Sequence, residues 1–430
     1  MLLECVVARS TVCLRQVAQG DPAKNMQFWR FVSNERVSVD KLIAGWGERT
    51  REAVVGRHVL AIQDTSELKF ATTEDDRRGL GKVKKGSAYG ALLHAMIGVD
   101  ADSGVLLGLV GGRVWTRQGD VETPHAERPL EEKESERWVD TARQAKESLA
   151  GAAMITLVAD RESEFYANWA LSPAANVHML ARLMKDRAVV KGGTVRKALR
   201  RLPVAARAVI ELRERPDRKA RAAHLSLRFG SMELRRPRNT VEQGLPANIS
   251  VNVVEVVEPN PPKNAEPVHW ILLTTHDVST PEQAWQIVGW YRQRWIIEQF
   301  FRTMKTQGLR IEDSQLTTAD GLCKLIAIAA SAAAIVMQLV QARDGKDTQP
   351  ASLAFKEHEI KLIALINQRL QGKTARRQNP HPPNSLAWAA WVIAKLGGWH
   401  EYQNKPPGPI TFHNGLTAFR AAASILDLVV

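Results

Sequence analysis

The sequence predicts an α/β fold, α+β overall, in which helices flank a mixed β-sheet. Two observations support this class. Over residues 51–186, short apolar runs suited to buried strands alternate with amphipathic helical segments. Helical patterns dominate both ends of the chain, at residues 1–50 and 346–430. At 430 residues the chain is too long for one compact core, so we expect two or three domains.

The N-terminal region carries apolar side chains at helical spacing, for example over residues 37–46. The spacing then changes to that of a strand at residues 58–63, a short apolar run that ends at Asp64. We therefore expect a helical region of residues 1–50, followed by the first strand of a sheet.

The rest of the first core segment, residues 51–186, repeats strand and helix patterns. The expected elements are strands at 89–99 and 105–115, a helix at 131–149, a strand at 154–159, a short helix at 163–171 and a strand at 177–183. The order β-β-β-α-β-α-β matches the ribonuclease-H-like fold, in which the first and fourth strands lie side by side. Because Asp64 ends the first strand and Asp160 the fourth, both carboxylates are expected at one edge of the sheet.

Residues 187–268 differ in character, because short β-like pieces stand there among turns and charged residues. Residues 185–238 contain 17 Lys and Arg against 5 Asp and Glu. We interpret this segment as a β-rich insertion with a basic surface. The core is expected to resume over residues 269–345, with a strand at 268–275 followed by a long helix that Thr280 caps.

Composition narrows the range of partners. The formal net charge of +13 favours a polyanionic partner, with nucleic acid as the first candidate and a merely basic enzyme or a ribosomal protein as the alternative. Three cysteines without a Cys-x-x-Cys pair argue against disulfides and structural zinc, which indicates a reducing, cytoplasmic compartment. The most apolar run, residues 325–337, is too short for a membrane span and suits a buried helix, so we expect no membrane partner.

The stretch YRQRWIIEQFFRTMK has the most informative pattern in the chain. On a helix, which turns by about 100° per residue, four functional side chains fall within a stripe about 60° wide. These four are Tyr291, Arg294, Glu298 and Lys305. Apolar side chains take the opposite side, at Ile296, Ile297, Phe300 and Met304. The apolar face is thus expected to pack in the protein interior, while the other face is equipped to hold a divalent cation beside a phosphodiester.

Three carboxylates, those of Asp64, Asp160 and Glu298, are the candidates for that cation site. Each alone has an ordinary interpretation, because an Asp after a strand is usually a turn residue and a Glu on a helix is usually a solvated charge. Their joint occurrence favours catalysis. Mg²⁺ prefers oxygen ligands, and two ions about 3.5–4 Å apart can activate the attacking oxygen and stabilise the leaving one. Arg294 and Lys305 would supply positive charge to the phosphate.

At these residues the chain resembles the insertion-sequence DDE transposases that carry the signature Y-x2-R-x3-E-x6-K. The segments AIQDTSEL, EKESERW, VADRESEF and LGGW are similar as well, and the resemblance extends over nearly the whole chain from about Trp29. It implies a ribonuclease-H-like catalytic core, in which two Mg²⁺ ions act and Mn²⁺ can substitute. It also implies cut-and-paste transposition, meaning cleavage at the element ends, a hairpin intermediate and strand transfer.

The resemblance assigns roles to individual residues. It implies that Asp64, Asp160 and Glu298 are the catalytic, metal-binding triad. The residues that it places near DNA are Tyr291, Arg294, Lys305, Arg182, Lys185, Trp270 and Arg161. For Trp270 two interpretations stay open, because the family position can accommodate a displaced base, whereas a tryptophan on a strand belongs equally well to a core.

The implied partner is double-stranded DNA, both element ends and target, bound by a homodimer that uses the C-terminal region in the bacterial cytoplasm at the nucleoid. In one respect the chain departs from the group: only 25 residues precede Met26, where relatives carry a longer helical region that binds element ends. An alternative is therefore an N-terminally shortened, non-catalytic copy that pairs with and inhibits a full-length transposase. A domesticated nuclease is a third, weaker possibility.

Overall fold

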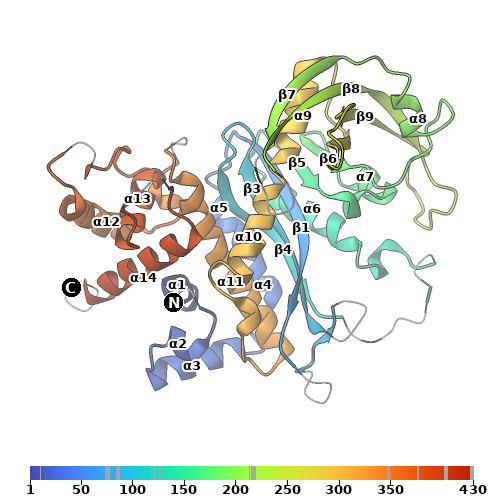
Figure 1. Ribbon diagram of the computed structural model, residues 1–430. Coiled ribbons are helices and arrows are strands. Elements are labelled where there is room, and N and C mark those ends of the chain that lie inside the picture. The colour runs from blue at the N-terminus through green and yellow to red at the C-terminus, as the bar shows by residue number, and fades with distance from the viewer. Residues whose placement is uncertain are drawn as a thin grey trace.

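The structure is a computed structural model that describes residues 1–9, 11–72, 78–83, 88–117, 119, 123–124, 127–212, 214, 219–345, 349–374, 377–400 and 405–426. Within these residues, ten strands form one mixed sheet, and helices pack on it and extend from it (Figure 1). The predicted α/β class is confirmed. The domain boundaries given above stay predictions.

The N-terminal region is helical, as predicted. Its elements are α1 (Leu2–Arg9), α2 (Leu14–Val17), α3 (Pro22–Val32), α4 (Val39–Ala44) and α5 (Trp46–Thr50). Local capping explains where two of them begin. The carboxylate of Asp21 accepts the backbone N–H groups of Ala23 and Lys24 at the start of α3, and the Ser38 hydroxyl accepts that of Lys41 at the start of α4.

The first core segment follows the predicted order, with one short additional strand. Its elements are β1 (His58–Lys69), β2 (Gly81–Lys82), β3 (Tyr89–Asp100), β4 (Leu106–Trp115), η1 (Leu130–Glu132), α6 (Glu136–Ser148), β5 (Met154–Ala159), η2 (Arg161–Ser163), α7 (Tyr166–Leu171) and β6 (Val177–Arg182). In the sheet, β1 lies between antiparallel β3 and parallel β5, and β6 is parallel to β5. The first and fourth predicted strands, β1 and β5, are thus neighbours, as the ribonuclease-H-like order requires.

Two predicted boundaries in this segment are wrong. The first strand does not end at Asp64, because β1 continues to Lys69 while it pairs with β3. Only its parallel pairing with β5 stops early, at the pair Ile62 and Val158. The helix predicted from residue 131 begins at Glu136, because a separate 3-10 turn forms over Leu130–Glu132.

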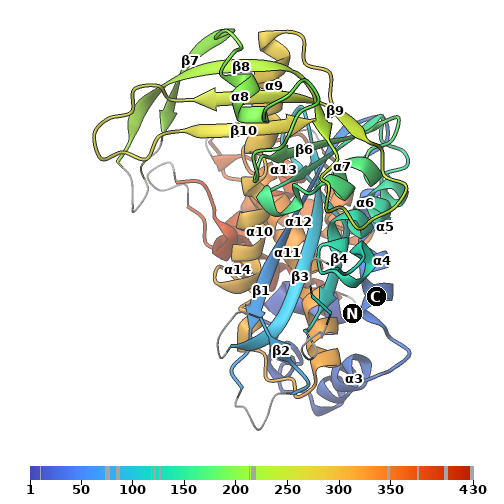
Figure 2. The same ribbon diagram turned by 90° about the vertical axis from the view of Figure 1, so that its right-hand side faces the viewer.

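The basic, β-rich segment adds strands to the same sheet. It contains α8 (Val195–Leu199), β7 (Ala206–Leu212), β8 (Arg221–Arg235) and β9 (Asn248–Val257), and β10 (His269–Thr274) follows it. The sheet continues from β6 through β10, β9 and β8 to β7, and these strands lie together beyond the first core segment (Figure 2). Part of the basic segment, residues 213 and 215–218, falls outside the described residues.

The remaining elements are helical. They are α9 (Pro281–Arg292), α10 (Trp295–Lys305), η3 (Ile311–Asp313), α11 (Ala319–Ala342), η4 (Ala351–Leu353), α12 (Glu357–Leu370), α13 (Leu386–Leu396) and α14 (Pro409–Leu426). Helix α9 begins as predicted, with Thr280 and Gln283 in a capping box and Pro281 in the first turn.

The single long helix predicted for the YRQRWIIEQFFRTMK stretch is wrong, because the chain turns between α9 and α10 at Gln293 and Arg294. There the backbone makes tighter bonds: the Arg294 N–H donates to the Tyr291 carbonyl at 3.1 Å, and the Ile297 N–H donates to the Arg294 carbonyl at 3.2 Å. The tighter turn changes the rotation about the helix axis, so side chains of α9 and α10 do not share the single stripe that a continuous α-helix would give. Tyr291, in the last turn of α9, packs inside the protein, with 6 % of its surface exposed.

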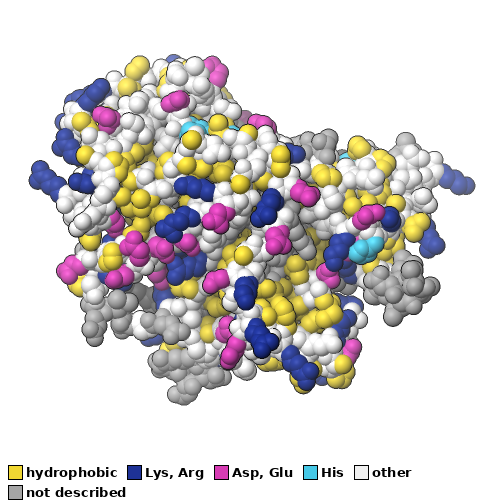
Figure 3. All heavy atoms as spheres, turned by 180° about the vertical axis from the view of Figure 1, so that it is seen from behind, with side chains coloured by type: hydrophobic (Ala, Val, Ile, Leu, Met, Phe, Trp, Pro, Cys, Tyr) yellow, Lys and Arg dark blue, Asp and Glu magenta, His cyan; other side chains and the backbone are white. Residues whose placement is uncertain are grey.

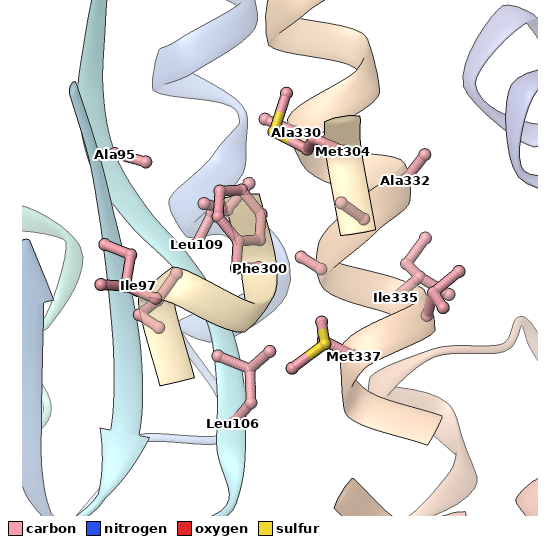
Figure 4. Packing of buried hydrophobic residues seen from close by; sticks show 14 of the residues in the cluster. Ala95, Ile97, Leu106, Leu109, Phe300, Met304, Ala330, Ala332, Ile335 and Met337 are labelled. Atoms are coloured by element: carbon pink, nitrogen blue, oxygen red, sulfur yellow. The ribbon is translucent and has the colours of Figure 1, made fainter. Parts of the chain in front are cut away.

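Helix α11 forms the centre of the helical side. By length and composition it could cross a membrane, but nearly all of its surface is buried inside the protein, where it contacts β4, α1, α10 and α13. Phe300 and Met304 of α10 lie between this helix and the sheet strands that carry Ile97 and Leu106 (Figure 4). The predicted buried helix over residues 325–337 is therefore confirmed, as is the burial of the apolar face of α10.

Candidate active site

Two aspartates lie side by side in the middle of the sheet, where the pairing between β1 and β5 ends. The last parallel pair between β1 and β5 joins Ile62 to Val158, and Asp64 and Asp160 each follow that pair by two residues. Successive side chains on a strand alternate between faces, so these two carboxylates project on the same side. The expectation that the topology brings Asp64 and Asp160 together is confirmed.

A backbone N–H group orients each carboxylate. The Thr65 N–H donates to Asp64 Oδ1 at 2.7 Å, and the Glu162 N–H donates to Asp160 Oδ1 at 2.8 Å. In both residues one carboxylate oxygen is thereby held toward its own backbone. The other oxygen of Asp64, Oδ2, faces Arg294.

The guanidinium of Arg294 links β1 of the sheet to α10. Its Nη1 lies 3.2 Å from Asp64 Oδ2, and its Nη2 donates to Glu298 Oε1. Glu298 stands in the first turn of α10, one turn after Arg294, so both side chains reach the same side. One guanidinium therefore bridges two of the three predicted carboxylates.

Three carboxylates lie close together at this position, those of Asp64, Asp160 and Glu298. Burial, together with the nearby carboxylates of Asp160 and Glu298, raises the pKa of Asp64 to about 7, although the Thr65 N–H and Arg294 act in the opposite direction. A carboxylate in this position needs a nearby positive charge to stay ionised at neutral pH. In this structure Arg294 supplies part of that charge.

Three of the predicted DNA-contacting arginines gather beside the carboxylates. Burial lowers the pKa of Arg182, and repulsion from Arg161 and Arg294 lowers it further, so Arg182 lies within electrostatic reach of both other guanidinium groups. Arg182 is anchored at the end of β6, where its Nη2 donates to the His269 carbonyl at 2.8 Å. Arg161, in η2, is exposed directly after Asp160.

Tyr291 and Trp270 form a packed pair next to this cluster. Their ring centroids lie 5.4 Å apart in an edge-on arrangement, with Trp270 on β10 partly buried. Burial raises the pKa of Tyr291. The expectation that Tyr291 lies on an open face is wrong, because its side chain is buried against the sheet side of α9, where it contacts Trp270. Both interpretations of Trp270 remain compatible with its partial exposure.

Lys305 and Lys185 occupy different places. The Lys305 ammonium donates to the Glu67 carbonyl and lies 3.9 Å from Glu312 Oε1, so it joins the end of α10 to β1 a few residues beyond Asp64. Lys185 is exposed after β6, in the loop whose backbone approaches Glu164.

One residue of this region was missed by the sequence analysis. Arg137, in the EKESERW segment, lies buried behind the two aspartates and donates to Thr65 Oγ1 at 2.9 Å and to Glu162 Oε2 at 3.0 Å. A signal for it exists, because Arg137 precedes Trp138 and stands one helical turn before Thr141, on the face that α6 turns to the sheet. Periodicity alone could not indicate what a charged residue on a packed face would touch.

By chemistry the donor set fits a hard divalent cation. Carboxylate oxygens are the ligands that such ions prefer, and crowding of Asp64 by other carboxylates is the situation that a cation relieves. Among the described residues, however, no three His, Cys, Asp or Glu side chains are arranged to hold a metal ion. Asp64 and Asp160 provide a pair, while Glu298 is engaged by Arg294. A three-carboxylate site requires this guanidinium to move.

Surface charge on one face of the molecule is mixed. Figure 3 shows a face on which Lys and Arg side chains are interspersed with Asp and Glu and with apolar side chains. On this face the net positive charge is therefore spread out instead of forming one continuous patch.

Comparison with known proteins gives two findings. Residues 56–335, more than half of the chain, match the family described as the Transposase DDE domain. Among solved structures, the chain is similar to the piggyBac transposase synaptic complex with hairpin DNA, determined by cryo-EM, with a TM-score of 0.35 and 13% sequence identity. That similarity covers 75% of this chain and 56% of the piggyBac chain, so it spans little more than half of the length of that protein.

Proposed function

The chain belongs to the family of proteins with a transposase DDE domain, and from this premise we propose that it is a DNA transposase that cleaves and joins DNA at the ends of an insertion sequence. The proposed reaction is cut-and-paste, with cleavage, a hairpin intermediate and strand transfer. The observation that carries the proposal is the placement of Asp64 in β1 beside Asp160, which directly follows the neighbouring strand β5, with Glu298 linked to the same position by Arg294.

Each group of residues has a proposed task. Asp64 and Asp160 would hold divalent cations, Mg²⁺ or Mn²⁺, with Glu298 as the third carboxylate. Such ions, when bound, activate the attacking oxygen and stabilise the charge on the leaving one. The backbone N–H groups of Thr65 and Glu162 keep one oxygen of each aspartate in place.

The cluster of Arg161, Arg182 and Arg294 is suited to the DNA backbone. Guanidinium groups bind phosphate oxygens through paired hydrogen bonds, and a bound phosphate would offset the repulsion that Arg161 and Arg294 exert on Arg182. Phosphate binding would therefore draw Arg294 from the carboxylates and free Asp64 and Glu298 for the cation. In this proposal Tyr291 positions Arg294, and Lys305 and Lys185 lie along the path of the DNA.

The proposed partners follow from this reaction. The substrate is double-stranded DNA, both as element ends and as target, and the acting unit is a homodimer assembled on DNA in the bacterial cytoplasm. The net charge of +13 supports attraction to DNA in general, although it does not select a sequence.

The proposal is tested with the inverted repeats that flank the coding region in its genome. Purified chain is incubated with duplexes that carry these repeats, with Mg²⁺, with Mn²⁺ or with EDTA, and strand cleavage is followed on denaturing gels. We expect cleavage at the repeat ends with either cation and none with EDTA. Asp64→Asn and Glu298→Gln should both remove it. Cleavage that persists in EDTA would exclude the proposed chemistry.

The alternative function, a non-catalytic copy that inhibits a full-length transposase, predicts a different outcome. Such a chain would bind a full-length relative and lower its activity, but would cut no DNA under any of these conditions. Mixing the two proteins in the same cleavage assay separates the alternatives. A domesticated nuclease would instead be encoded without flanking inverted repeats.

A further inference from the structure

A buried arginine connects the segments that carry the two aspartates, in β1 and directly after β5. Arg137 of α6 exposes 10 % of its side chain, and all three nitrogens of its guanidinium group are used. Its Nε donates to Thr65 Oγ1 at 2.9 Å, its Nη2 to Glu162 Oε2 at 3.0 Å and its Nη1 to the Glu134 carbonyl at 2.7 Å. A residue with a single charged nitrogen could not make this set of bonds.

The two side chains that Arg137 holds belong to the residues that orient the aspartates. Thr65 donates its backbone N–H to Asp64, and Glu162 donates its backbone N–H to Asp160. Arg137 itself contacts neither carboxylate through these bonds. It holds the two residues whose backbones fix them, Thr65 in β1 and Glu162 in η2, directly after β5.

The connection matters because the backbone pairing between the two strands ends just before the aspartates. The last parallel pair of β1 and β5 is Ile62 with Val158. Beyond it β1 continues along β3, whereas the chain after β5 turns into η2. The bonds of Arg137 therefore join the two segments where the sheet ladder no longer does.

The guanidinium is itself held by a buried network. It lies over the rings of Trp138 and Trp115, 5.3 Å and 5.9 Å from their centroids. Thr65 Oγ1 lies 2.8 Å from His94 Nδ1, and His94 Nε2 lies 3.2 Å from Gln63 Oε1.

The bonds of this network fix where the protons of Thr65 and His94 can point. Burial keeps the pKa of His94 well below its ordinary value, so the ring is neutral. Because the Thr65 oxygen accepts from Arg137, its own proton is free to point to His94 Nδ1, and His94 then donates from Nε2 to Gln63. Thr65 is thus fixed from both sides.

From this arrangement we propose that Arg137 is a positioning residue, which sets the relative placement of the Asp64 and Asp160 carboxylates and thereby the affinity of the pair for a divalent cation. The inference rests on the proposed function, since it assumes that these two aspartates bind the cation. Partners that orient metal ligands typically change metal affinity by about 10–100-fold when they are removed.

The test measures Mn²⁺ binding to the purified full chain by isothermal titration and by the electron paramagnetic resonance signal of free Mn²⁺. Arg137→Gln and Arg137→Lys should each bind Mn²⁺ roughly tenfold or more weakly than wild type. Arg113→Gln is the matched control, because Arg113 also lies near Trp115 and pairs with Glu136 at 3.1 Å on the exposed side of β4. The control should bind Mn²⁺ as wild type does.

Glu162 provides a second arm that does not disturb the buried guanidinium, because its side chain is 64 % exposed. Glu162→Ala should weaken Mn²⁺ binding, whereas Glu162→Gln, which keeps an accepting oxygen for Arg137, should restore most of it. In an Arg137→Gln background, Glu162→Ala should have little further effect, since both changes remove the same contact between Arg137 and Glu162. A full additional loss in the double variant would mean that Glu162 acts independently of Arg137, and would overturn the proposal.

Two further outcomes are decisive. A folded Arg137→Gln protein that binds Mn²⁺ as tightly as wild type overturns the positioning role. If Asp64→Asn and Asp160→Asn also leave Mn²⁺ binding unchanged, the proposed cation site itself fails, and the two failures are thereby distinguished. Circular dichroism of every variant verifies folding, and if Arg137→Gln does not fold, the Glu162 variants decide the question.

Discussion

Arg294 Nη1 lies 3.2 Å from Asp64 Oδ2, although 230 residues separate the two in the sequence. The contact joins the start of α10 to the middle of β1, and the same guanidinium also donates to Glu298. The positive charge of Arg294 thus lies between the two carboxylates that would bind the proposed cation. Arginine and cation are therefore competitors for Asp64 and Glu298.

The raised pKa of Asp64 predicts how stability depends on pH. The folded protein holds this pKa at about 7, against an ordinary value of 3.8, so between these values the folded state binds more protons than the unfolded state. Stability from this group is therefore lost as pH rises through about 7. Asp64→Asn should stabilise the protein on the order of 2–4 kcal/mol at pH 8 and far less at pH 5.

Urea denaturation of wild type and variant at the two pH values checks this prediction. Asp313→Asn is the control, since Asp313 forms a surface pair with Arg310. The control should show the same small difference at both pH values. If the gain from Asp64→Asn is also independent of pH, the Asp64 carboxyl does not titrate in this range.

Asp160→Ala should abolish Mg²⁺-dependent strand cleavage while DNA affinity stays nearly unchanged. The reason is that its proposed role is cation binding beside Asp64, not contact with the DNA backbone. Cleavage is measured on gels and affinity by fluorescence anisotropy. Asp140→Ala, on the outer side of α6, should cleave normally. Full cleavage by Asp160→Ala would remove this residue from the proposed site.

Lys305→Ala should weaken DNA binding and reduce the slope of log K against log salt by about one, because one phosphate contact would be lost. Lys305 is partly exposed at the end of α10, where it also donates to the Glu67 carbonyl. Lys361→Ala serves as the control, since Lys361 pairs with Glu357 on exposed α12. An unchanged slope for Lys305→Ala would assign this lysine to holding α10 against β1.

The central strands and their aspartates could be predicted because buried parallel strands have a local signature. Residues 154–159 are an uninterrupted apolar run apart from Thr156, and they form β5 with the predicted bounds. Asp160 follows directly, where the chain leaves the sheet. Chain order then sufficed to place β1 beside β5.

What could not be predicted depends on contacts between distant residues. The extension of β1 to Lys69 results from its pairing with β3, and the joining of β10 to β6 merges the basic strands with the core sheet. The turn at Gln293 and Arg294 has no proline or glycine to mark it. The role of Arg137 depends on Thr65 and Glu162, which lie 72 and 25 residues away.

The apolar face of α10 leads to the last prediction. Phe300 is fully buried and points between the sheet residues Ala95 and Leu109 and the α11 residues Ala330 and Met337 (Figure 4). Phe300→Ala should lower the free energy of unfolding by about 3–5 kcal/mol, because the lost contacts leave a cavity in a closely packed core. Urea denaturation measures this loss. Leu365→Ala, at an exposed position of α12, should change stability by less than about 0.5 kcal/mol.

A functional consequence of Phe300→Ala follows from its position on the helix. Phe300 stands two residues after Glu298, so a shift of α10 into the cavity would move Glu298 and Arg294 relative to Asp64. Phe300→Leu keeps most of the volume and should retain more cleavage activity than Phe300→Ala at a temperature where both remain folded. Equal activity of the two variants would show that the placement of α10 does not depend on this side chain, and that the turn at Arg294 alone positions Glu298.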